Sequence, residues 1–284
     1  MSQLQSAVNV DGNLITIPAS FGTQSGNVTI TGSDIEIVMS NSATINGAIQ
    51  IGAGTNRATR IRWTGGNMTG GPLEINSADD VLINDFHATT DGEANAWTGG
   101  GGTGQGTRRL AVLNSTIRVV NATNNAWAIY TSPTPNEDFI FANLKVVGSG
   151  QNNRLQNIRN LIIVDSILNP DGQSVNSFRT HDDCTNVYVR DTIIGPGGWL
   201  ADPRNGALGI ANGTFERVTK YSNLSAFLTD YEQTGTFNNG TLYSVNGTPG
   251  QEAGIGGFSG SNNRIVSWDG SSLHHDASQY GAVR

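Results

Sequence analysis

The feature that most constrains this chain is a short β-rich segment that recurs along its length. Each copy has a few β-formers, then Asn or Asp, then more β-formers, as in VLINDFHA, LIIVDSIL and VYVRDTII. Successive Asx residues lie roughly 26 residues apart, a period typical of one small unit stacked many times without a domain boundary. They are Asp85, Asn114, Asn143, Asp165, Asp191, Asn212, Asn239 and Asp269.

A second set of residues precedes the first by about five positions in many copies. Its members are Asp80, Arg109, Asp138, Asn160, Asn186 and Asn263. Asn and Asp tolerate a left-handed backbone and hydrogen-bond their own turn. Each unit is therefore expected to open with a turn residue, run through a short strand, and turn again.

The repeat predicts an all-β coil of three short strands and three turns. Units of about 26 residues are shorter than a propeller blade of about 40–45 residues and lack the leucine-rich pattern. Stacked coils pair equivalent strands in parallel sheets around a continuous core, and equivalent Asn side chains bond up the stack. The low charged fraction of 14% and the 37 glycines suit many short strands and turns. About ten coils are expected.

These segments resemble the right-handed parallel β-helix superfamily, which includes pectate-lyase-like enzymes and bacteriophage tailspikes. The resemblance covers about residues 30–275 and rests on the Asx-punctuated repeat. It implies an N-terminal cap over residues 1–30, a β-helix over 31–272 and a short tail over 273–284. Because a solenoid end exposes strand edges, we expect another chain or an oligomer interface to protect the C-terminal end.

The charge balance argues against several partners. The net charge is −7, and Lys145 and Lys220 are the only lysines, so no basic stripe is available for nucleic acid or an anionic membrane surface. No apolar run approaches the ~20 residues of a membrane-spanning helix. The N-terminal segment MSQLQSAVNVDGNLITIPAS lacks the charged and apolar regions of a signal peptide. We therefore expect a protein assembled in a cytoplasm, or a secreted one whose signal has been removed.

The segment RTHDDCTNVYVRD, residues 179–191, has the densest cluster of reactive side chains. In the structural interpretation, which we favour, residues 182–185 form the turn before a strand at 187–189. Cys184 is then a small, partly buried hydrophobe rather than a nucleophile. In this interpretation the cluster is one more turn–strand–turn unit.

The functional alternative comes from the resemblance to polysaccharide lyases. That resemblance implies acidic residues holding Ca²⁺ against a substrate carboxylate, and a basic residue that takes the neighbouring proton. Here Asp182 and Asp183 are the metal-ligand candidates, and Arg179, His181 or Arg190 the candidate base. The chain matches none of the lyase motifs convincingly. A glycosidase would need two carboxyl groups about 5–9.5 Å apart, and no such pair is evident in the sequence.

Three tryptophans form another candidate site. Trp97 and Trp127 both follow Asn-Ala, and Trp199 falls at a similar place in a later unit, together with Phe178 and Phe227. Outward-facing rings would stack on sugars, whereas inward-facing rings would form part of the core. We favour the inward interpretation, and an interface between chains is a third option.

Two classes of function remain open. The favoured class is a structural protein of a virus particle, such as a bacteriophage spike, fibre or capsid-decoration protein, located on the virion, with host surface glycans as candidate ligands. The resemblance implies a homo-oligomer, a trimer in tailspike-like proteins, in contact with other virion proteins and needing no cofactor. The alternative is a secreted polysaccharide lyase or glycoside hydrolase acting on acidic polysaccharide, with Ca²⁺ if it is a lyase.

Overall fold

The computed structural model describes residues 1–91, 97–99, 106–120, 125–129, 136–148, 152–168, 176–181, 184–195, 198–202, 210–222, 233–244, 250–252, 258–267 and 269. Within these ranges nearly every regular element is a β-strand. The exceptions are α1 (Ser2–Ala7) and a single 3₁₀ turn, η1 (Ala19–Phe21).

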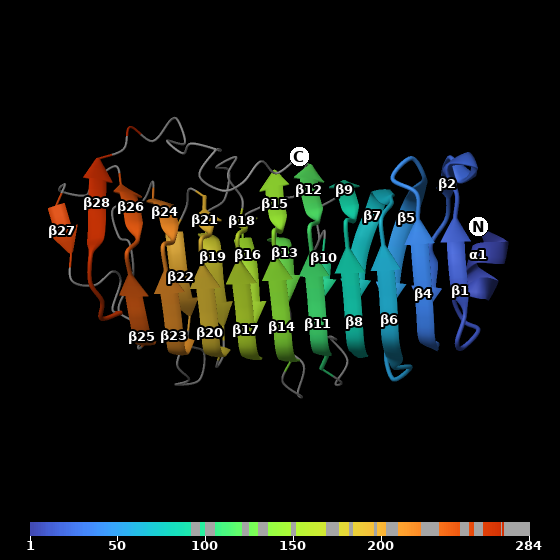
Figure 1. The fold of residues 1–284 in the computed structure, drawn as a ribbon, viewed down its shortest axis with the longest axis horizontal. Helices are drawn as coiled ribbons and strands as arrows, with labels where there is room; N and C mark the ends of the chain where they lie inside the picture. The colour runs from blue at the N-terminus through green and yellow to red at the C-terminus, as the bar shows by residue number, and fades with distance from the viewer. Residues whose placement is uncertain are drawn as a thin grey trace.

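Ten strands form a parallel sheet, sheet A, along one side of the molecule (Figure 1). Each strand pairs with the equivalent strand of the next coil. They are β1 (Leu14–Ile17), β4 (Ser33–Met39), β6 (Ala58–Thr64), β8 (Ala78–Asn84), β11 (Arg108–Leu113), β14 (Asn136–Ala142), β17 (Ile158–Val164), β20 (Cys184–Arg190), β23 (Ile210–Glu216) and β25 (Gln233–Asn238).

Sheet B contains the other strands, which stack in two rows. The first row is β2 (Thr23–Ser25), β5 (Thr44–Ile51), β7 (Asn67–Ile75), β9 (His87–Asp91), β12 (Thr116–Val120), β15 (Lys145–Gly148), β18 (Ile167–Leu168), β21 (Ile193–Ile194), β24 (Thr219–Ser222), β26 (Thr241–Ser244) and β28 (Asn263–Ser267). The second row is β3 (Val28–Ile30), the distal halves of β5 and β7, β10 (Trp97–Gly99), β13 (Asn125–Ile129), β16 (Asn152–Gln156), β19 (Asn176–His181) and β22 (Gly198–Asp202). β27 (Gly250–Glu252) pairs antiparallel with β28.

The chain is a right-handed parallel β-helix: the stacked parallel coil is the one that the repeat predicted, and the handedness is the one that the resemblance implied. Each coil supplies one strand to sheet A and up to two to sheet B. The regular body from β4 to β23 makes about seven turns, slightly fewer than the ten coils expected. The difference lies at the two ends, where β1 follows the end helix and β25 joins β23 through a register shift.

The core consists of columns of apolar side chains, one residue from each coil. One such column of sheet A is almost fully buried and comprises Ile35, Ile61, Val81, Leu110, Phe139, Leu161 and Val187. The stacking buries apolar surface continuously along the rod, which is the main stabilising term in such a fold. One basic side chain shares this interior, because Lys220 lies between Ile194 and Leu242 in a sheet B column. Its Nζ donates to the Gly195 carbonyl at 3.0 Å, and burial lowers the pKa of Lys220 well below its ordinary value.

Two columns of left-handed residues border sheet A. The strand-entry column, with φ between 54° and 60°, comprises Asp34, Arg60, Asp80, Arg109, Asp138, Asn160, Asn186 and Asn212. The strand-exit column, with φ between 48° and 57°, comprises Asp85, Asn114, Asn143, Asp165, Asp191, Arg217, Asn239 and Asn262. The predicted amide ladder is present: Asn186 donates to Asn160 at 2.8 Å, and Asn143 donates to Asn114 at 3.0 Å.

The sequence placed most of these turn residues in the correct column, with two errors. Asn212 lies in the strand-entry column, where it donates to Asn186, and Arg217 occupies the strand-exit position of that coil. In the last described coil, Asn262 holds the strand-exit position and donates to Asn239, whereas Asp269, predicted there, and Asn263, predicted at the strand entry and buried, are not left-handed. The first error arises because Asn was expected at each turn, whereas an arginine can also occupy it.

The segment 1–30, expected to form a cap, has two parts. α1 buries Leu4 at the end of the stack and contacts β3, whereas β1, β2 and β3 already belong to the two sheets. The expected tail over 273–284 lies outside the described residues. Over the described part of the chain, no helix is long and apolar enough to cross a membrane.

Candidate binding face on the outer surface of sheet A

The strand-entry column begins as a ladder of alternating charges. The Arg60 guanidinium donates both to Asp34 Oδ1 and, at 2.6 Å, to Asp34 Oδ2. Arg109 likewise donates to both carboxylate oxygens of Asp80, at 2.5 and 3.0 Å. The hydrogen bonds from these arginines hold the pKa of Asp34 and of Asp80 below the ordinary range. Both carboxylates are therefore ionised and paired at neutral pH.

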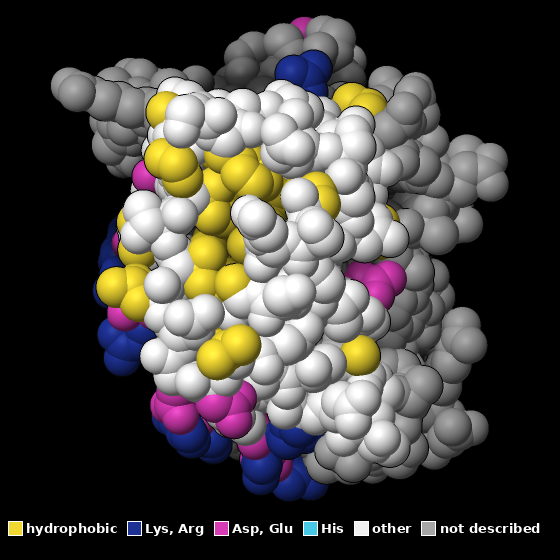
Figure 2. All heavy atoms as spheres, turned by 90° about the vertical axis from the view of Figure 1, so that its right-hand side faces the viewer, with side chains coloured by type: hydrophobic (Ala, Val, Ile, Leu, Met, Phe, Trp, Pro, Cys, Tyr) yellow, Lys and Arg dark blue, Asp and Glu magenta, His cyan; other side chains and the backbone are white. Residues whose placement is uncertain are grey.

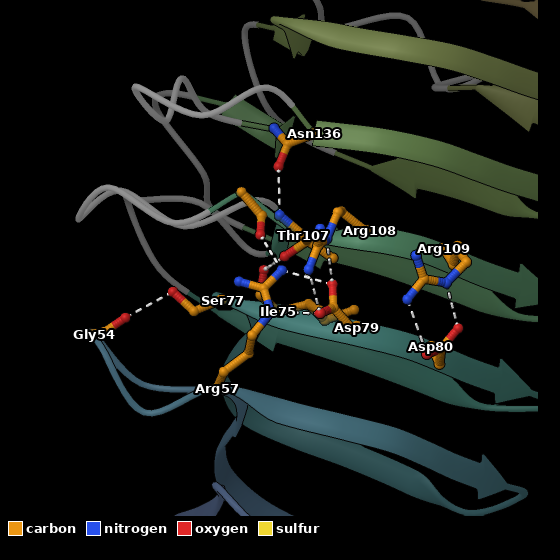
Figure 3. A network of polar contacts seen from close by, with 11 residues as sticks. Gly54, Arg57, Ile75, Ser77, Asp79, Asp80, Thr107, Arg108, Arg109 and Asn136 are labelled. Carbon is orange, nitrogen blue, oxygen red and sulfur yellow. Dashed lines mark hydrogen bonds and ion pairs between the residues drawn. The ribbon is translucent and has the colours of Figure 1, made fainter.

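A more buried ion cluster lies next to this ladder and consists of Asp79 in β8, Arg108 in β11 and Arg57, which directly precedes β6 (Figure 3). Arg57 donates to both carboxylate oxygens of Asp79 at 2.6 Å, and Arg108 does so at 2.9 and 2.8 Å. Burial alone would raise the pKa of Asp79, but the hydrogen bonds from Arg57 and Arg108 outweigh it, so the pKa falls well below its ordinary value. Arg57 also donates to the Gly106 carbonyl at 2.8 Å. One carboxylate thus joins three successive coils.

A shallow polar depression of about 250 Å³ lies beside this cluster. Its lining is Asp34, Ile35, Glu36, Arg60, Arg62 and Asp80, from β4, β6 and β8. Both signs of charge line it, which suits a polar, uncharged ligand group better than a strongly ionic one.

From β8 onward, the outer surface between the two left-handed columns becomes apolar. One outward residue of each strand stands in register, forming an apolar row of Leu82, Ala111, Ile140, Ile162 and Tyr188. Ile140 and Ile162 are 41% and 37% exposed and lie side by side in this row, so their exposed surfaces form a continuous apolar patch. Leu113, Ala142 and Val164 form a parallel second row. Polar left-handed residues flank this surface on both sides.

Two of the residues singled out in the sequence can be placed in full. Cys184 is buried, with Sγ 3.7 Å from the Leu155 carbonyl, so its interpretation as a small core residue is confirmed. Arg190 faces outward from β20, with Nε 3.1 Å from Asp191 Oδ2. Asp191 also accepts from Arg217 at 2.6 and 2.8 Å, and that hydrogen bonding lowers the pKa of Asp191. The structure therefore brings Arg190 into a paired ion cluster.

The other candidates are placed only through the backbone or not at all. Arg179 and His181 lie in β19, in register with Arg154 and Gln156, and His181 also pairs with Asp202. Their side chains, and Asp182 and Asp183 altogether, lie outside the described residues. Elsewhere in the described chain, no group of three or more His, Cys, Asp or Glu could hold a metal ion. The predicted Ca²⁺ site thus stays a prediction.

The tryptophan candidates share the second row of sheet B. The backbone of Trp97 pairs with Leu73, that of Trp127 with Asn153, and that of Trp199 with Phe178. Their side chains and Phe227 lie outside the described part of the chain, so sugar stacking by these rings stays a prediction.

Sequence reasoning missed the Asp79 cluster and the apolar row. A signal for the cluster exists, because Asp79-Asp80 and Arg108-Arg109 are adjacent pairs of opposite charge. Arg108 follows Asp79 by 29 residues, which equals the coil length there, so the pairs had to meet in register. The apolar row has a weaker signal, because Ile140 and Ile162 sit inside runs whose neighbours are equally apolar.

The fold and this face define a parallel β-helix protein with a flat, repetitive outer surface. No protein-family model matches the sequence, and no curated protein matches it. Among solved structures, the chain is similar to the Streptococcus pneumoniae surface protein and adhesin PfbA, with a TM-score of 0.43 and 10% identity over 93% of this chain and 92% of that one. This similarity is too distant to assign the adhesin's role to this chain.

Proposed function

We propose that this protein is a rigid surface-binding rod that uses the outer face of sheet A to hold a surface polysaccharide. The observation that carries the proposal is the partly exposed apolar row, Leu82 to Tyr188, set between two polar columns. The row repeats once per coil, about 4.8 Å apart. A polymer lying along the rod therefore meets the same chemistry at every step.

The apolar row and the polar columns match the apolar ring face and the hydroxyl groups of a sugar. Aliphatic and aromatic side chains such as Ile140, Ile162 and Tyr188 suit the apolar face of a pyranose ring. Amide groups such as those of Asn160 and Asn186 accept and donate hydrogen bonds to hydroxyls. Because these amides are already held in a ladder, little side-chain entropy is lost when a ligand binds.

The ion pairs support binding rather than acid–base chemistry on this face. A general acid is most effective when its pKa lies near the working pH. The pKa values of Asp34, Asp79 and Asp80 are instead lowered by their arginine partners. These carboxylates stay charged and serve to hold neighbouring coils together.

The finer proposal is that the rod belongs to a virus particle, as a spike, fibre or capsid-decoration protein. Its support is the resemblance of the repeat to tailspike-like β-helices, which also suggests a homotrimer in contact with other virion proteins. The alternative location is a secreted protein. Capsid or tail genes beside the coding gene would support the virion, and secretion genes would favour the alternative.

The binding proposal is tested by immobilising surface polysaccharides and measuring retention of the protein. The variant Ile140→Asp/Ile162→Asp places charge in the apolar row, and we expect retention to fall at least tenfold. The control Val38→Asp changes another exposed apolar residue, in β4 and outside the apolar row, and should retain binding. Equal retention of both variants and the wild type would refute this binding face.

The same polysaccharides test the enzymatic alternative. Its support is that His181 pairs in register with two polar residues of the neighbouring coils, Gln156 and Asp202. Release of unsaturated sugars with Ca²⁺, abolished in Asp183→Ala, would show a lyase. Retention without product is the result expected here.

A further inference from the structure

At the N-terminal end of the rod, the edge strands β3 and β1 differ in whether their outward backbone groups are hydrogen-bonded. At the β3 edge, side chains replace a neighbouring strand. The Gln5 amide donates to the Thr29 carbonyl at 2.8 Å and accepts from the Thr29 N–H at 2.8 Å. Asn9 likewise donates to Thr29 O at 3.2 Å and accepts from Thr31 N at 3.0 Å. This edge is therefore closed by the chain itself.

The β1 edge of sheet A is open. The carbonyls of Asn13 and Ile17 accept from β4, so the alternation of a parallel ladder turns the backbone N–H and C=O of Leu14 and Thr16 away from β4. Among the described residues, nothing hydrogen-bonds these outward groups, and the strand that α1 contacts most extensively is β3. An unpaired strand edge is a template for another strand.

The side chains at this end favour association instead of preventing it. Leu14 is 65% exposed and Val10 56% exposed, the two most exposed large hydrophobic residues described. Residues 1–33 carry one charged side chain, Asp11, whose Oδ1 already accepts from Ser33 N at 2.7 Å. Figure 2, which views this end, shows hydrophobic side chains gathered on it and charged ones toward its margins. Natural edge strands usually carry charge or proline against pairing.

We propose that β1 pairs antiparallel with β1 of a second copy, joining two rods end to end across a two-fold axis. In this arrangement Leu14 of one copy faces Thr16 of the other, and both side chains lie on the outer face of the merged sheet. Both residues direct their backbone groups to the open edge, so each pair exchanges two N–H···O bonds. Ile15 and Ile17 of both copies then continue the buried column.

The sequence selects this register over its neighbours. Shifting the pairing by one step in one direction places Thr16 opposite Gly12, whose N–H already donates to Ser33 O at 3.0 Å. Shifting it in the other direction places Leu14 opposite Pro18 of the second copy. Pro18 has no N–H, so hydrogen bonds are lost. Charge selects the second copy as the partner: with a net charge of −7, two chains repel least where they meet through their nearly uncharged ends. The proposal concerns self-association and stands apart from the polysaccharide site.

A mixing experiment tests the register. Leu14→Cys protein and Thr16→Cys protein are mixed under mild oxidation, and disulfide-linked dimers are measured by mass spectrometry. Facing residues of such a pair are about 5.5 Å apart, within disulfide range. Each variant alone places its cysteines on a diagonal of about 7–8 Å, which is too far. We expect cross-links in the mixture at least tenfold above either variant alone. Equal cross-linking in all three samples, or none, would overturn the proposal.

A second measurement follows the mass in solution by analytical ultracentrifugation. Thr16→Pro removes an outward N–H without breaking the β1–β4 ladder, and Leu14→Lys adds charge at the edge. Both should halve the mass relative to the wild type while circular dichroism stays unchanged. The control is Val38→Lys, the same kind of change one strand inward, where Val38 pairs with Thr16 and Thr64. It should keep the wild-type mass. The inference would be contradicted if the wild type had the same mass in solution as Leu14→Lys. It would also be contradicted if Val38→Lys lowered the mass as much as Leu14→Lys does.

Discussion

The two halves of the strand-entry column have the same backbone and different chemistry. From Asp34 to Arg109 the column alternates acid and base, and each arginine grips the aspartate of the preceding coil. From Asn160 to Asn212 the same positions carry amides that donate up the stack one after another. Asp138 joins the halves by accepting from Asn160 at 2.7 Å. The fold thus requires a left-handed turn in each coil and accepts either an ion pair or an amide ladder there.

The arginines show how this requirement is met by an unfavourable residue. Outside glycine, left-handed backbone is commonest for Asn and Asp, and long side chains adopt it at a cost. Three described arginines adopt it: Arg60, Arg109 and Arg217. Each makes a bidentate pair with an aspartate 26 or 29 residues earlier in its own column. The bidentate ion pair therefore offsets the backbone strain at these arginines, in the place of the amide ladder found at left-handed asparagines.

The largest expected effect separates the buried cluster from the exposed ladder beside it. Asp79→Asn leaves Arg57, whose side chain is 22% exposed, without its charge partner. We expect a loss of about 3 kcal/mol in the free energy of unfolding, measured by urea denaturation. The matched control Asp80→Asn changes the adjacent, exposed carboxylate and should cost less than about 1 kcal/mol. Equal losses would mean that burial does not distinguish the two pairs.

The pH dependence of stability follows from the same carboxylate. The pKa of Asp79 is lowered in the folded protein from its ordinary value of 3.8. Its contribution is thus fully present above about pH 4 and is lost as the pH falls toward the lowered value. Between neutral pH and pH 3, the wild type should lose more stability than Asp79→Asn. Parallel curves from acid titration of unfolding would contradict this.

The next effect tests the left-handed backbone itself. Arg109→Val removes the ion pair with Asp80 and puts a β-branched residue in the left-handed conformation, which it disfavours. We expect the free energy of unfolding to fall by about 2 kcal/mol. Arg109→Gly loses the same pair but relieves the strain, and its cost should be near zero. Thermal unfolding of both variants gives the difference. A glycine variant as unstable as the valine variant would place the cost in the ion pair instead.

The smallest effect contrasts the two halves by their response to salt. Asn186→Gly keeps the left-handed turn and removes amide bonds to Asn160 and Asn212, at about 1 kcal/mol. That loss should be the same at low salt and in about 1 M salt, because salt screens exposed ion pairs and leaves hydrogen bonds between neutral amides almost unchanged. The loss in Arg109→Val, by contrast, should be smaller at about 1 M salt, because salt weakens the exposed ion pair with Asp80 that this variant removes. Denaturation curves at both salt levels check this, and a salt-sensitive amide ladder would remove the distinction.

The sequence predicted the coil, its three strands and most members of both columns, because Asn and Asp mark left-handed turns with few alternatives. It misplaced Asn212 and overlooked Arg217, because an arginine in that conformation depends on an aspartate in another coil. The candidate site was harder to predict. Only the register shows that Leu82, Ile140 and Tyr188 share one row, and register depends on the length of every intervening turn.

The central claim is that equivalent residues stack in register, one coil apart, along sheet A. The double variant Asn160→Cys/Asn186→Cys tests it most directly, since these positions lie in adjacent coils about 4.8 Å apart. Mild oxidation and mass spectrometry of peptides should show a disulfide within one chain. The variant Asn160→Cys/Asn212→Cys spans two coils, about 9.6 Å, and should show none. No bond in the first variant, or equal bonds in both, would contradict the stacked coil.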